Sequence, residues 1–333
     1  PVAVTLGSSN QDALIRYTRD GSEPDSLDAL AGGPIPIAAN TVLRARGFED
    51  GLLPGPILSL SWFFGEEREL PLISLVTDPD HLWDDDQGIY VLGDFYNPDY
   101  PHYGANFWQP WERPAHLEFY ETDGSLVIAQ DIGIRIHGGY TRALPQKSLR
   151  LIARNGYGEG SMDHEVFPGL DIDEFKYLVL RNAGNDWSRA HCRDGLMQRI
   201  AHASGVDHQG YRPAALFLNG EYWGVHNLRE RLDPDYIESH KGFGEDEIDL
   251  IKEYDFVMAG DELHYEAMME FIETNDLADP AVFAAVQGMM DTDDFLAYCA
   301  LEVLFANYDW PGGNIKTWRP RNAGGIWRWL LYD

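Results

Sequence analysis

The chain has 333 residues, 44% of them hydrophobic, which is enough for one large domain and one small domain. Its 55 acidic and 25 basic residues give a net charge of −30, and no cluster of Lys and Arg interrupts this acidity. Because such a surface repels nucleic acid and anionic lipid, we expect no nucleic-acid partner. No apolar run is long enough to predict a membrane span.

The two cysteines, Cys192 and Cys299, are too few for a disulfide framework. Both stand in helix-like segments, so we expect buried free thiols. The sequence starts without Met in a strand-like run (PVAVTL) and stops at Asp333 on an apolar strand. We therefore expect a fragment of a longer protein, in which case the missing signal peptide says nothing about its compartment.

Residues 1–66 are rich in turns and in short alternating segments. IRYTRDGSEP (15–24) alternates and then turns at Asp-Gly, and further strands are predicted within 41–51 and 57–64. Short strands separated by Gly and Pro turns are typical of a small β-sandwich, which we expect here.

From Glu69 the pattern changes to longer strands. An apolar strand is predicted over 70–78, and a hairpin over 111–126 turns at Asp-Gly. Residues 131–154 indicate a strand, a Gly-rich turn and a second strand.

Helix signals follow later in the chain. Residues 175–205 predict a buried strand, a polar loop and a helix that ends at Gly205, and 211–232 predict a hairpin that turns at Asn-Gly. Two or three helices are expected within 233–306, and a last strand over 327–332. This order indicates an α+β fold with a sheet-rich front lobe and a helix-rich back lobe.

The last 25 residues carry a set of groups that suits metal-dependent phosphoryl transfer. Asp309 precedes Asn314 by five positions, and a predicted strand rich in aromatic residues then ends at Asp333. Such transfer needs one carboxylate for the incoming hydroxyl, and an amide oxygen and a second carboxylate for Mg²⁺. Protein kinases have the same Asp-x4-Asn spacing. The spacing alone favours an ordinary acidic turn, Asp-Trp-Pro-Gly-Gly-Asn, over a catalytic site.

A second candidate is the Gly-rich turn GGYTR (138–142), which lies between two alternating strands and precedes Lys147. The N–H groups of such a turn can bind an anion, and kinases hold ATP phosphates with a Gly-rich turn and a strand Lys. The alternative is an ordinary hairpin with a solvated Lys147, and the local sequence does not decide between the two.

Four segments in this order carry a family resemblance: IRIHGGYTRALPQKSLRL, LVLRNAGNDWSRAHCRDGLMQ, YRPAALFLNGEYWGVHNLRERLD and NYDWPGGNIKTWRP…WRWLLYD. Together they resemble the CotH family of spore-coat-type atypical protein kinases. The segments YTRDGSEP and LRARGF resemble the module at the C-terminus of chitobiase and related hexosaminidases. The resemblance implies a chitobiase-like module over 1–66 and an atypical kinase-like domain over 69–333, incomplete at its C-terminus.

The resemblance also implies an ATP–Mg²⁺ site. Asp309 would be the catalytic carboxylate that orients or deprotonates the hydroxyl. Asn314 and Asp333 would be the metal ligands.

Further residues are implied around the nucleotide. Lys147 and Arg142 would contact phosphate oxygens, and Glu230 would pair with Lys147 as the helix Glu does in ordinary kinases. Asp186 and Asp194 also lie in the family-like segments, and structural ion pairs are expected for both.

The predicted function is Mg²⁺-dependent transfer of the ATP γ-phosphoryl group to Ser or Thr of secreted or surface proteins. The alternative is a non-catalytic surface or envelope scaffold, or an adhesion protein, with a kinase-like fold. The chitobiase-like module implies an extracellular or cell-surface location. Glycan binding by residues 1–66 is a minor expectation, because no cluster of exposed aromatic residues marks a sugar platform there.

Overall fold

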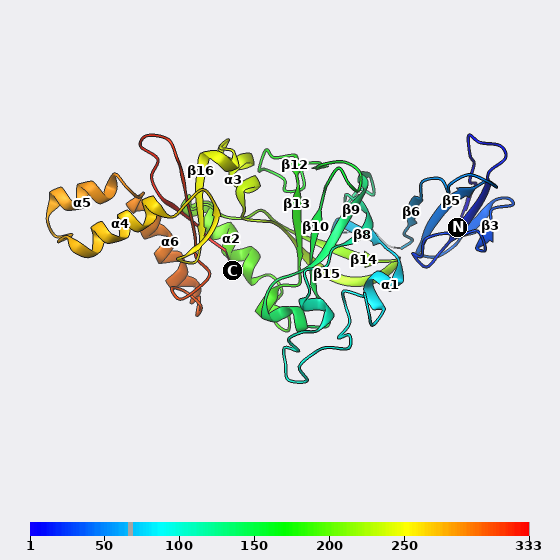
Figure 1. The fold of residues 1–333 in the computed structure, drawn as a ribbon, viewed down its shortest axis with the longest axis horizontal. Helices are drawn as coiled ribbons and strands as arrows, with labels where there is room; N and C mark the ends of the chain where they lie inside the picture. The colour runs from blue at the N-terminus through cyan, green and yellow to red at the C-terminus, as the bar shows by residue number, and fades with distance from the viewer. Residues whose placement is uncertain (66–68, 333) are drawn as a thin grey trace. The chain divides into compact units, whose positions relative to one another are not determined.

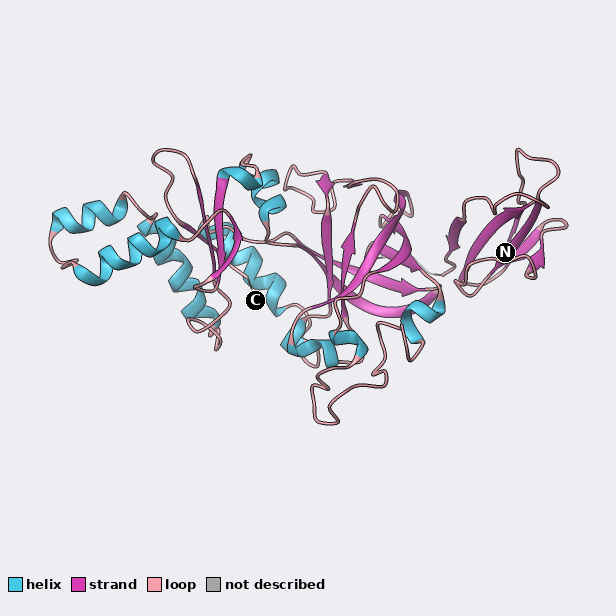
Figure 2. Ribbon diagram, in the orientation of Figure 1, coloured by secondary structure: helices cyan, strands magenta, loops and turns pink. Residues whose placement is uncertain are grey.

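The computed structural model describes residues 1–65 and 69–332 (Figures 1 and 2). The predicted end of the small domain at residue 66 and the predicted metal ligand Asp333 lie outside the described residues. The chain divides into two compact units. The first holds 1–164, 173–185 and 213–228, and the second holds 165–172, 186–212 and 229–333.

The first residues form the small β-sandwich that the sequence predicts. One antiparallel sheet has the order β3-β2-β5-β6, and β1 pairs with β4 in a second sheet. The strands are β1 (Val2–Val4), β2 (Leu14–Thr18), β3 (Ala29–Leu30), β4 (Ile35–Ile37), β5 (Thr41–Phe48) and β6 (Leu58–Trp62). Ile35 and Ile37 of β4 pack with Leu43 and Ala45 of β5, so the two sheets share one apolar core.

The next strands close into a seven-stranded barrel of the order β10-β13-β15-β14-β7-β8-β9. They are β7 (Leu72–Val76), β8 (Arg113–Tyr120), β9 (Leu126–His137), β10 (Ser148–Ile152), β13 (Tyr177–Arg181), β14 (Tyr211–Leu218) and β15 (Glu221–Glu230). β7 pairs in parallel with β14, whereas β8 pairs antiparallel with both β7 and β9. The sequence predicts the strands and the hairpins, but not their closure into a barrel.

The interior of the barrel is filled by aliphatic side chains. Ile134 and Ile136 of β9 lie directly opposite Leu151 and Leu149 of β10, and all four are buried. Because residues two apart share one face of a strand, this face points to the interior along both strands.

Short elements connect the barrel strands. They are α1 (Pro79–Trp83), three 3₁₀ turns, η1 (Asn106–Trp108), η2 (Tyr140–Ala143) and η3 (Gly184–Asp186), and the pair β11 (Met162–Asp163) and β12 (Glu174–Phe175). α1 begins where the Asp78 side chain accepts a hydrogen bond from the N–H of Asp80 and a Pro follows as first helical residue.

The β14–β15 hairpin turns at Asn219 and Gly220, as predicted. Both residues have positive φ, 49° and 83°, which a two-residue turn of this kind requires. Asn219 also extends the parallel pairing, because its N–H donates to the Leu75 carbonyl (2.9 Å) and its Oδ1 accepts from the N–H of Thr77 (2.9 Å).

The second unit holds the longer helices, α2 (Arg193–Ser204), α3 (Pro234–Lys241), α4 (Leu263–Thr274), α5 (Pro280–Gln287) and α6 (Thr292–Phe305), and the 3₁₀ turn η4 (Glu245–Glu247). α2 ends at Gly205 in the left-handed conformation, as predicted. Four α-helices, rather than the predicted two or three, lie within 233–306. α5 is separate from α4 because Asp279 caps it and Pro280 opens it.

A four-stranded antiparallel sheet of the order β17-β16-β18-β19 belongs to the same unit. Its strands are β16 (Ile248–Lys252), β17 (Phe256–Ala259), β18 (Lys316–Pro320) and β19 (Arg328–Leu330). The sequence analysis expected helices within 233–306 and missed the hairpin β16–β17 between them. The segment IDLIK does not alternate, since the buried Asp249 is paired with Arg319 and Arg321.

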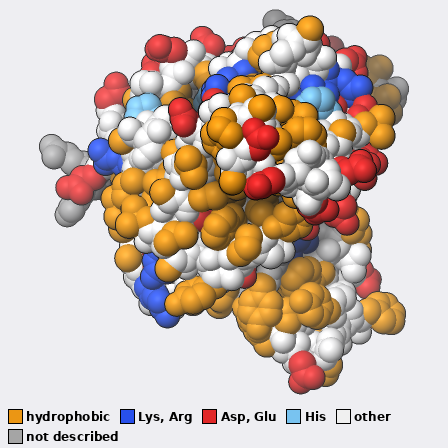
Figure 3. Space-filling model, turned by 90° about the vertical axis from the view of Figure 1, so that its left-hand side faces the viewer, with side chains coloured by type: hydrophobic (Ala, Val, Ile, Leu, Met, Phe, Trp, Pro, Cys, Tyr) orange, Lys and Arg blue, Asp and Glu red, His pale blue; other side chains and the backbone are white. Residues whose placement is uncertain are grey.

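The core of this unit packs α4 and α6 against β19 and the residues beside it, with Tyr298 and Trp327 fully buried. The other face of α6 exposes Leu296, Val303 and Leu304. Figure 3 shows hydrophobic side chains gathered over much of the face on which α4 and α5 lie in Figure 1. None of the helices in the described part of the chain is long and apolar enough to cross a membrane.

The prediction that both cysteines are buried is wrong. Cys192 is exposed because it stands at the N-cap position of α2, outside the helix that the sequence suggested for it. Cys299 lies on α6 and is only partly covered.

A buried carboxyl group lies on the outer face of the barrel, beneath β6. Glu118 is fully buried, and its Oε1 accepts from the N–H of Ser61 (3.2 Å) and from the Tyr120 hydroxyl (3.1 Å). Its Oε2 has no hydrogen-bond partner among the described residues. Burial raises the pKa of Glu118, although its hydrogen bonds act in the opposite direction.

This pKa predicts a pH-dependent stability. The folded protein holds the Glu118 proton to a higher pH than the unfolded chain does, so stability falls as pH rises from about 4.5 toward the folded pKa. Glu118→Gln replaces the titratable carboxyl group by an amide that does not ionise. We expect the free energy of unfolding of the wild type to fall relative to that of the variant as pH rises from about 4.5 to 8. Urea unfolding at several pH values measures this, and parallel curves for the two proteins would contradict it.

Candidate active site

Asp309 and Asn314 stand at the two ends of a tight turn that follows α6. The N–H of Gly313 donates to the Asp309 carbonyl (2.6 Å), and Asn314 has a positive φ of 58°. The chain folds back, and Nδ2 of Asn314 donates to Oδ2 of Asp309 at 3.4 Å. The five-residue spacing therefore brings a carboxylate and an amide together at the surface.

A polar relay ties this turn to α6. Glu302 is buried, and its Oε2 accepts from Nδ2 of Asn307 at 2.8 Å. Oδ1 of Asn307 in turn accepts from the N–H of Asp309 at 3.2 Å, and the N–H of Asn307 donates to the Glu302 carbonyl. The main chain of Asp309 is thus positioned by a carboxylate in the core.

The sequence analysis missed Glu302 and Asn307. A signal was present, because Glu302 is the single charged residue of the apolar run ALEVLF at the end of α6. A carboxylate on a buried helix face needs a polar partner, and Asn307 follows five residues later.

The Trp-rich strand that leads toward Asp333 is also fastened to α6. The N–H of Trp329 donates to Oδ2 of Asp294 at 2.9 Å, and burial raises the pKa of Asp294 to about 6. Nε1 of Trp327 donates to Nδ1 of His264 at 3.0 Å. Asp333 lies beyond the described residues, so its role as a metal ligand stays a prediction.

Lys147 and Arg142 meet at the Gly-rich turn, but both point at backbone carbonyls. Nζ of Lys147 donates to the carbonyls of Arg142 (2.7 Å) and Leu144 (3.1 Å). Nε of Arg142 donates to the Gly138 carbonyl (2.5 Å), and its Nη1 lies 3.3 Å from the Phe107 carbonyl. The two cations therefore hold the turn together.

The alternative of a solvated Lys147 is wrong. Its side chain is 4% exposed, and Nζ lies 3.9 Å from the centre of the Phe107 ring. Burial lowers the pKa of Lys147 to about 8. The aromatic cover comes from η1, which is some forty residues earlier in the chain and gives no local signal at Lys147.

Glu230 is buried in the second unit with both carboxylate oxygens engaged. Oε2 accepts from the N–H of Gly210 (2.6 Å), and Oε1 lies 2.7 Å from Nε2 of His240. The pairing of Glu230 with Lys147 that the family resemblance implies stays a prediction.

The two neighbouring acids are structural, as expected. Asp194, in the first turn of α2, forms a buried ion pair with Arg229 and accepts from Gln198 at 3.5 Å. Asp186 accepts from the N–H of Arg193 (3.1 Å) and from that of Ala190 (3.3 Å). These bonds fasten the beginning of α2.

Among the described residues, no three His, Cys, Asp or Glu side chains are grouped closely enough to hold a metal ion. Of the two metal ligands that the family resemblance implies, Asn314 offers an amide oxygen, a hard ligand of the kind that Mg²⁺ prefers, beside the carboxylate of Asp309. The other, Asp333, lies outside the described residues.

Two segments of the chain match known protein families. Residues 1–58 match the chitobiase/beta-hexosaminidase C-terminal domain, and residues 134–333 match the family described as CotH kinase protein. A search of curated proteins found no match. The second match spans more than half of the chain and includes the Gly-rich turn, the acid-bearing turn after α6 and the Trp-rich strand. The chain therefore belongs to the CotH kinase protein family.

Proposed function

We propose that this protein is an atypical protein kinase that transfers the γ-phosphoryl group of ATP to Ser or Thr of secreted or surface proteins. One observation carries the proposal: within a chain of the CotH kinase family, Asp309 and Asn314 lie side by side on an exposed turn. A carboxylate beside a metal-binding amide is the arrangement that phosphoryl transfer requires. We place the kinase-like domain at 69–333 and the accessory module at 1–66.

Asp309 is the proposed catalytic carboxylate. It accepts the proton of the attacking hydroxyl or orients that hydroxyl toward the phosphorus. The relay through Asn307 and Glu302 holds its main chain, so only the side chain has to adjust.

Asn314 and Asp333 are the proposed metal ligands. Bound Mg²⁺ would supply positive charge to the phosphate oxygens. Since Nδ2 of Asn314 is the atom that faces Asp309, its Oδ1 is the atom proposed for the metal.

Lys147 and Arg142 are proposed to act on the nucleotide through the Gly-rich turn. Their bonds to the carbonyls at 138, 142 and 144 fix the path of this turn, which is proposed to present N–H groups to a phosphate. Glu230 is proposed to assist Lys147 when the nucleotide is bound.

A second candidate function is a non-catalytic scaffold at the cell surface. One observation favours it: the cationic groups of Lys147 and Arg142 already donate to backbone carbonyls of the chain itself. Both functions are compatible with an extracellular or cell-surface location, which we propose on the basis of the two family matches.

Asp309→Asn separates the two functions. Asn keeps the oxygen that accepts from Asn314, but it cannot take up a proton. We expect nucleotide affinity to change by less than about threefold and phosphoryl transfer to fall by about 10²–10⁴-fold. The assays are γ-phosphate transfer from labelled ATP to the protein and to mixed Ser/Thr substrates, and calorimetric titration with Mg²⁺–ATP.

Asp293→Asn is the matched control, because Asp293 is an exposed carboxylate in the first turn of α6. Its transfer rate is expected to equal that of the wild type. If the wild type binds Mg²⁺–ATP and transfers nothing, the kinase proposal fails and the scaffold stands. Equal transfer by Asp309→Asn would show that Asp309 is not the catalytic carboxylate.

Lys147→Met tests the Gly-rich turn. We expect nucleotide affinity to fall tenfold to a hundredfold, because Met cannot donate to the carbonyls of Arg142 and Leu144 that fix the turn. One charge-assisted hydrogen bond is worth about 1.5–3 kcal/mol. Because burial lowers the pKa of Lys147 to about 8, wild-type affinity should also fall as pH rises through that value. Titrations at several pH values measure both effects.

Lys176→Met is the control, because Lys176 is exposed and lies directly before β13. Thermal unfolding of both variants separates a loss of affinity from a loss of fold. Similar small changes for the two variants, with no pH dependence in the wild type, would leave the turn without a role in nucleotide binding.

A further inference from the structure

A cavity of about 440 Å³ lies in the first unit, where α1 and the tip of the β14–β15 hairpin meet two loops of the β-sandwich. This volume is within the range of small-molecule sites. The side chains that matter in its lining are Arg19, Asp20, Asn40, Trp83, Glu221 and Trp223. None of them belongs to the site proposed for phosphoryl transfer.

Two tryptophans form the apolar part of the lining. The ring centres of Trp83 and Trp223 are 5.4 Å apart with planes inclined by 52°, and Trp83 is 42% exposed. Behind them the buried Tyr90 lies 5.1 Å from the Trp83 ring and accepts from Nε1 of Trp223 (3.2 Å). The indole rings therefore have a fixed orientation and leave aromatic surface uncovered.

Planar polar side chains surround these rings. The exposed carboxylate of Glu221 has no hydrogen bond or ion pair to another described residue. Oδ1 of Asn40 accepts from the N–H of Phe64 (2.8 Å), which leaves its two N–H donors available. One Nη of Arg19 donates to the Pro36 carbonyl at 3.3 Å, and its other donors are available.

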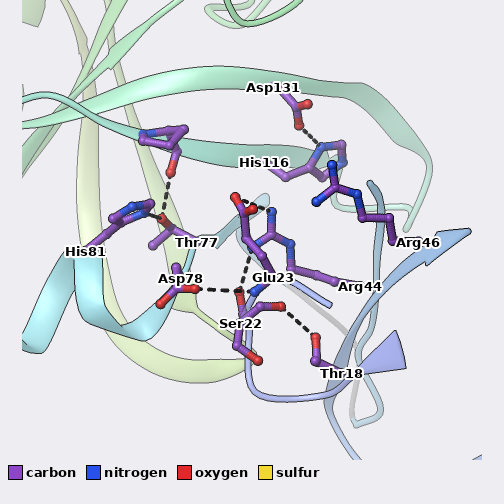
Figure 4. A network of polar contacts seen from close by, with 12 residues as sticks. Thr18, Ser22, Glu23, Arg44, Arg46, Thr77, Asp78, His81, His116 and Asp131 are labelled. Carbon is purple, nitrogen blue, oxygen red and sulfur yellow. Dashed lines mark hydrogen bonds and ion pairs between the residues drawn. The ribbon is translucent and has the colours of Figure 1, made fainter. Parts of the chain in front are cut away.

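The walls of the cavity are fastened to each other by polar contacts (Figure 4). The N–H of Glu23 donates to Oδ2 of Asp78, the residue that caps α1, at 3.3 Å. The Glu23 carboxylate lies 3.8 Å from the Arg44 guanidinium. Gly21 packs so tightly on Asn219 that a Cβ at Gly21 would lie 2.5 Å from its side chain. A cavity with walls held in this way loses little entropy when it binds a ligand.

We propose that this cavity binds a neutral pyranose unit of a polysaccharide, with equatorial hydroxyl groups of the glucose type. In such a sugar the axial C–H bonds form a weakly positive face, which the negative face of an indole ring attracts. The equatorial hydroxyls point outward from the ring, where Glu221 accepts from them and Asn40 and Arg19 donate to them. Asp20 and Glu221 repel an acidic sugar, which limits the class to neutral ones.

Trp83 ends α1 and Trp223 lies on β15, whereas the β-sandwich contributes polar residues and Val42 but no aromatic ring. The β-sandwich alone therefore lacks the aromatic surface, and the site requires the two parts together.

Calorimetric titration of the whole chain with cellotetraose and with the tetramer of N-acetylglucosamine tests the proposal. We expect at least one of them to bind, with a dissociation constant of about 1 mM or below, the range of a single weak site. Trp83→Ala should weaken this binding about tenfold, because it removes one aromatic stacking partner. Glu221→Gln should weaken it as well, and this exposed position does not disturb folding.

Tyr222→Ala is the matched control, because Tyr222 is an exposed aromatic residue on the same hairpin and does not line the cavity. It should bind like the wild type, and Mg²⁺–ATP titrations should be the same for all three variants. The proposal is overturned if neither oligosaccharide binds at about 10 mM, ten times the weakest expected constant. It is also overturned if Trp83→Ala and Glu221→Gln both bind as tightly as the wild type.

Discussion

The pairing of β7 with β14 is the constraint on which the rest of the first unit depends. It joins residues some 140 positions apart, and it closes the strands into a barrel by pairing the β14–β15 hairpin with β7. Without it, the strands would form an open sheet with two unpaired edges, which is a poor scaffold for a fixed site. The tip of the hairpin, the start of α1 and the tryptophans of the cavity all take their positions from this pairing.

The sequence predicts the elements whose signals are local. The Asn219-Gly220 turn, the end of α2 at Gly205 and the turn between Asp309 and Asn314 each follow from the conformational preference of one or two residues. Closure of the barrel, the sheet around β16 and the aromatic cover of Lys147 depend on contacts between distant segments. Periodicity within a short window carries no information about such contacts.

The net charge of the chain sets a condition for the proposed nucleotide site. A chain with a net charge of −30 repels a nucleotide as it repels nucleic acid, and salt screens this repulsion only beyond about 8–10 Å. A nucleotide site on this protein therefore depends on positive charge placed close to the phosphates. Lys147 and Arg142 lie together at one turn, where both donate to backbone carbonyls.

The contact between Gly21 and Asn219 has an evolutionary consequence. A side chain at 21 would collide with the Asn219 side chain at the hairpin tip. A substitution at 21 therefore requires a smaller residue at 219. In relatives that carry the same module directly before the barrel, substitutions at these positions should appear as pairs. In relatives that carry the barrel without the module, no loop contacts the position equivalent to Asn219. The residue there is then restricted only by the positive φ that the turn requires.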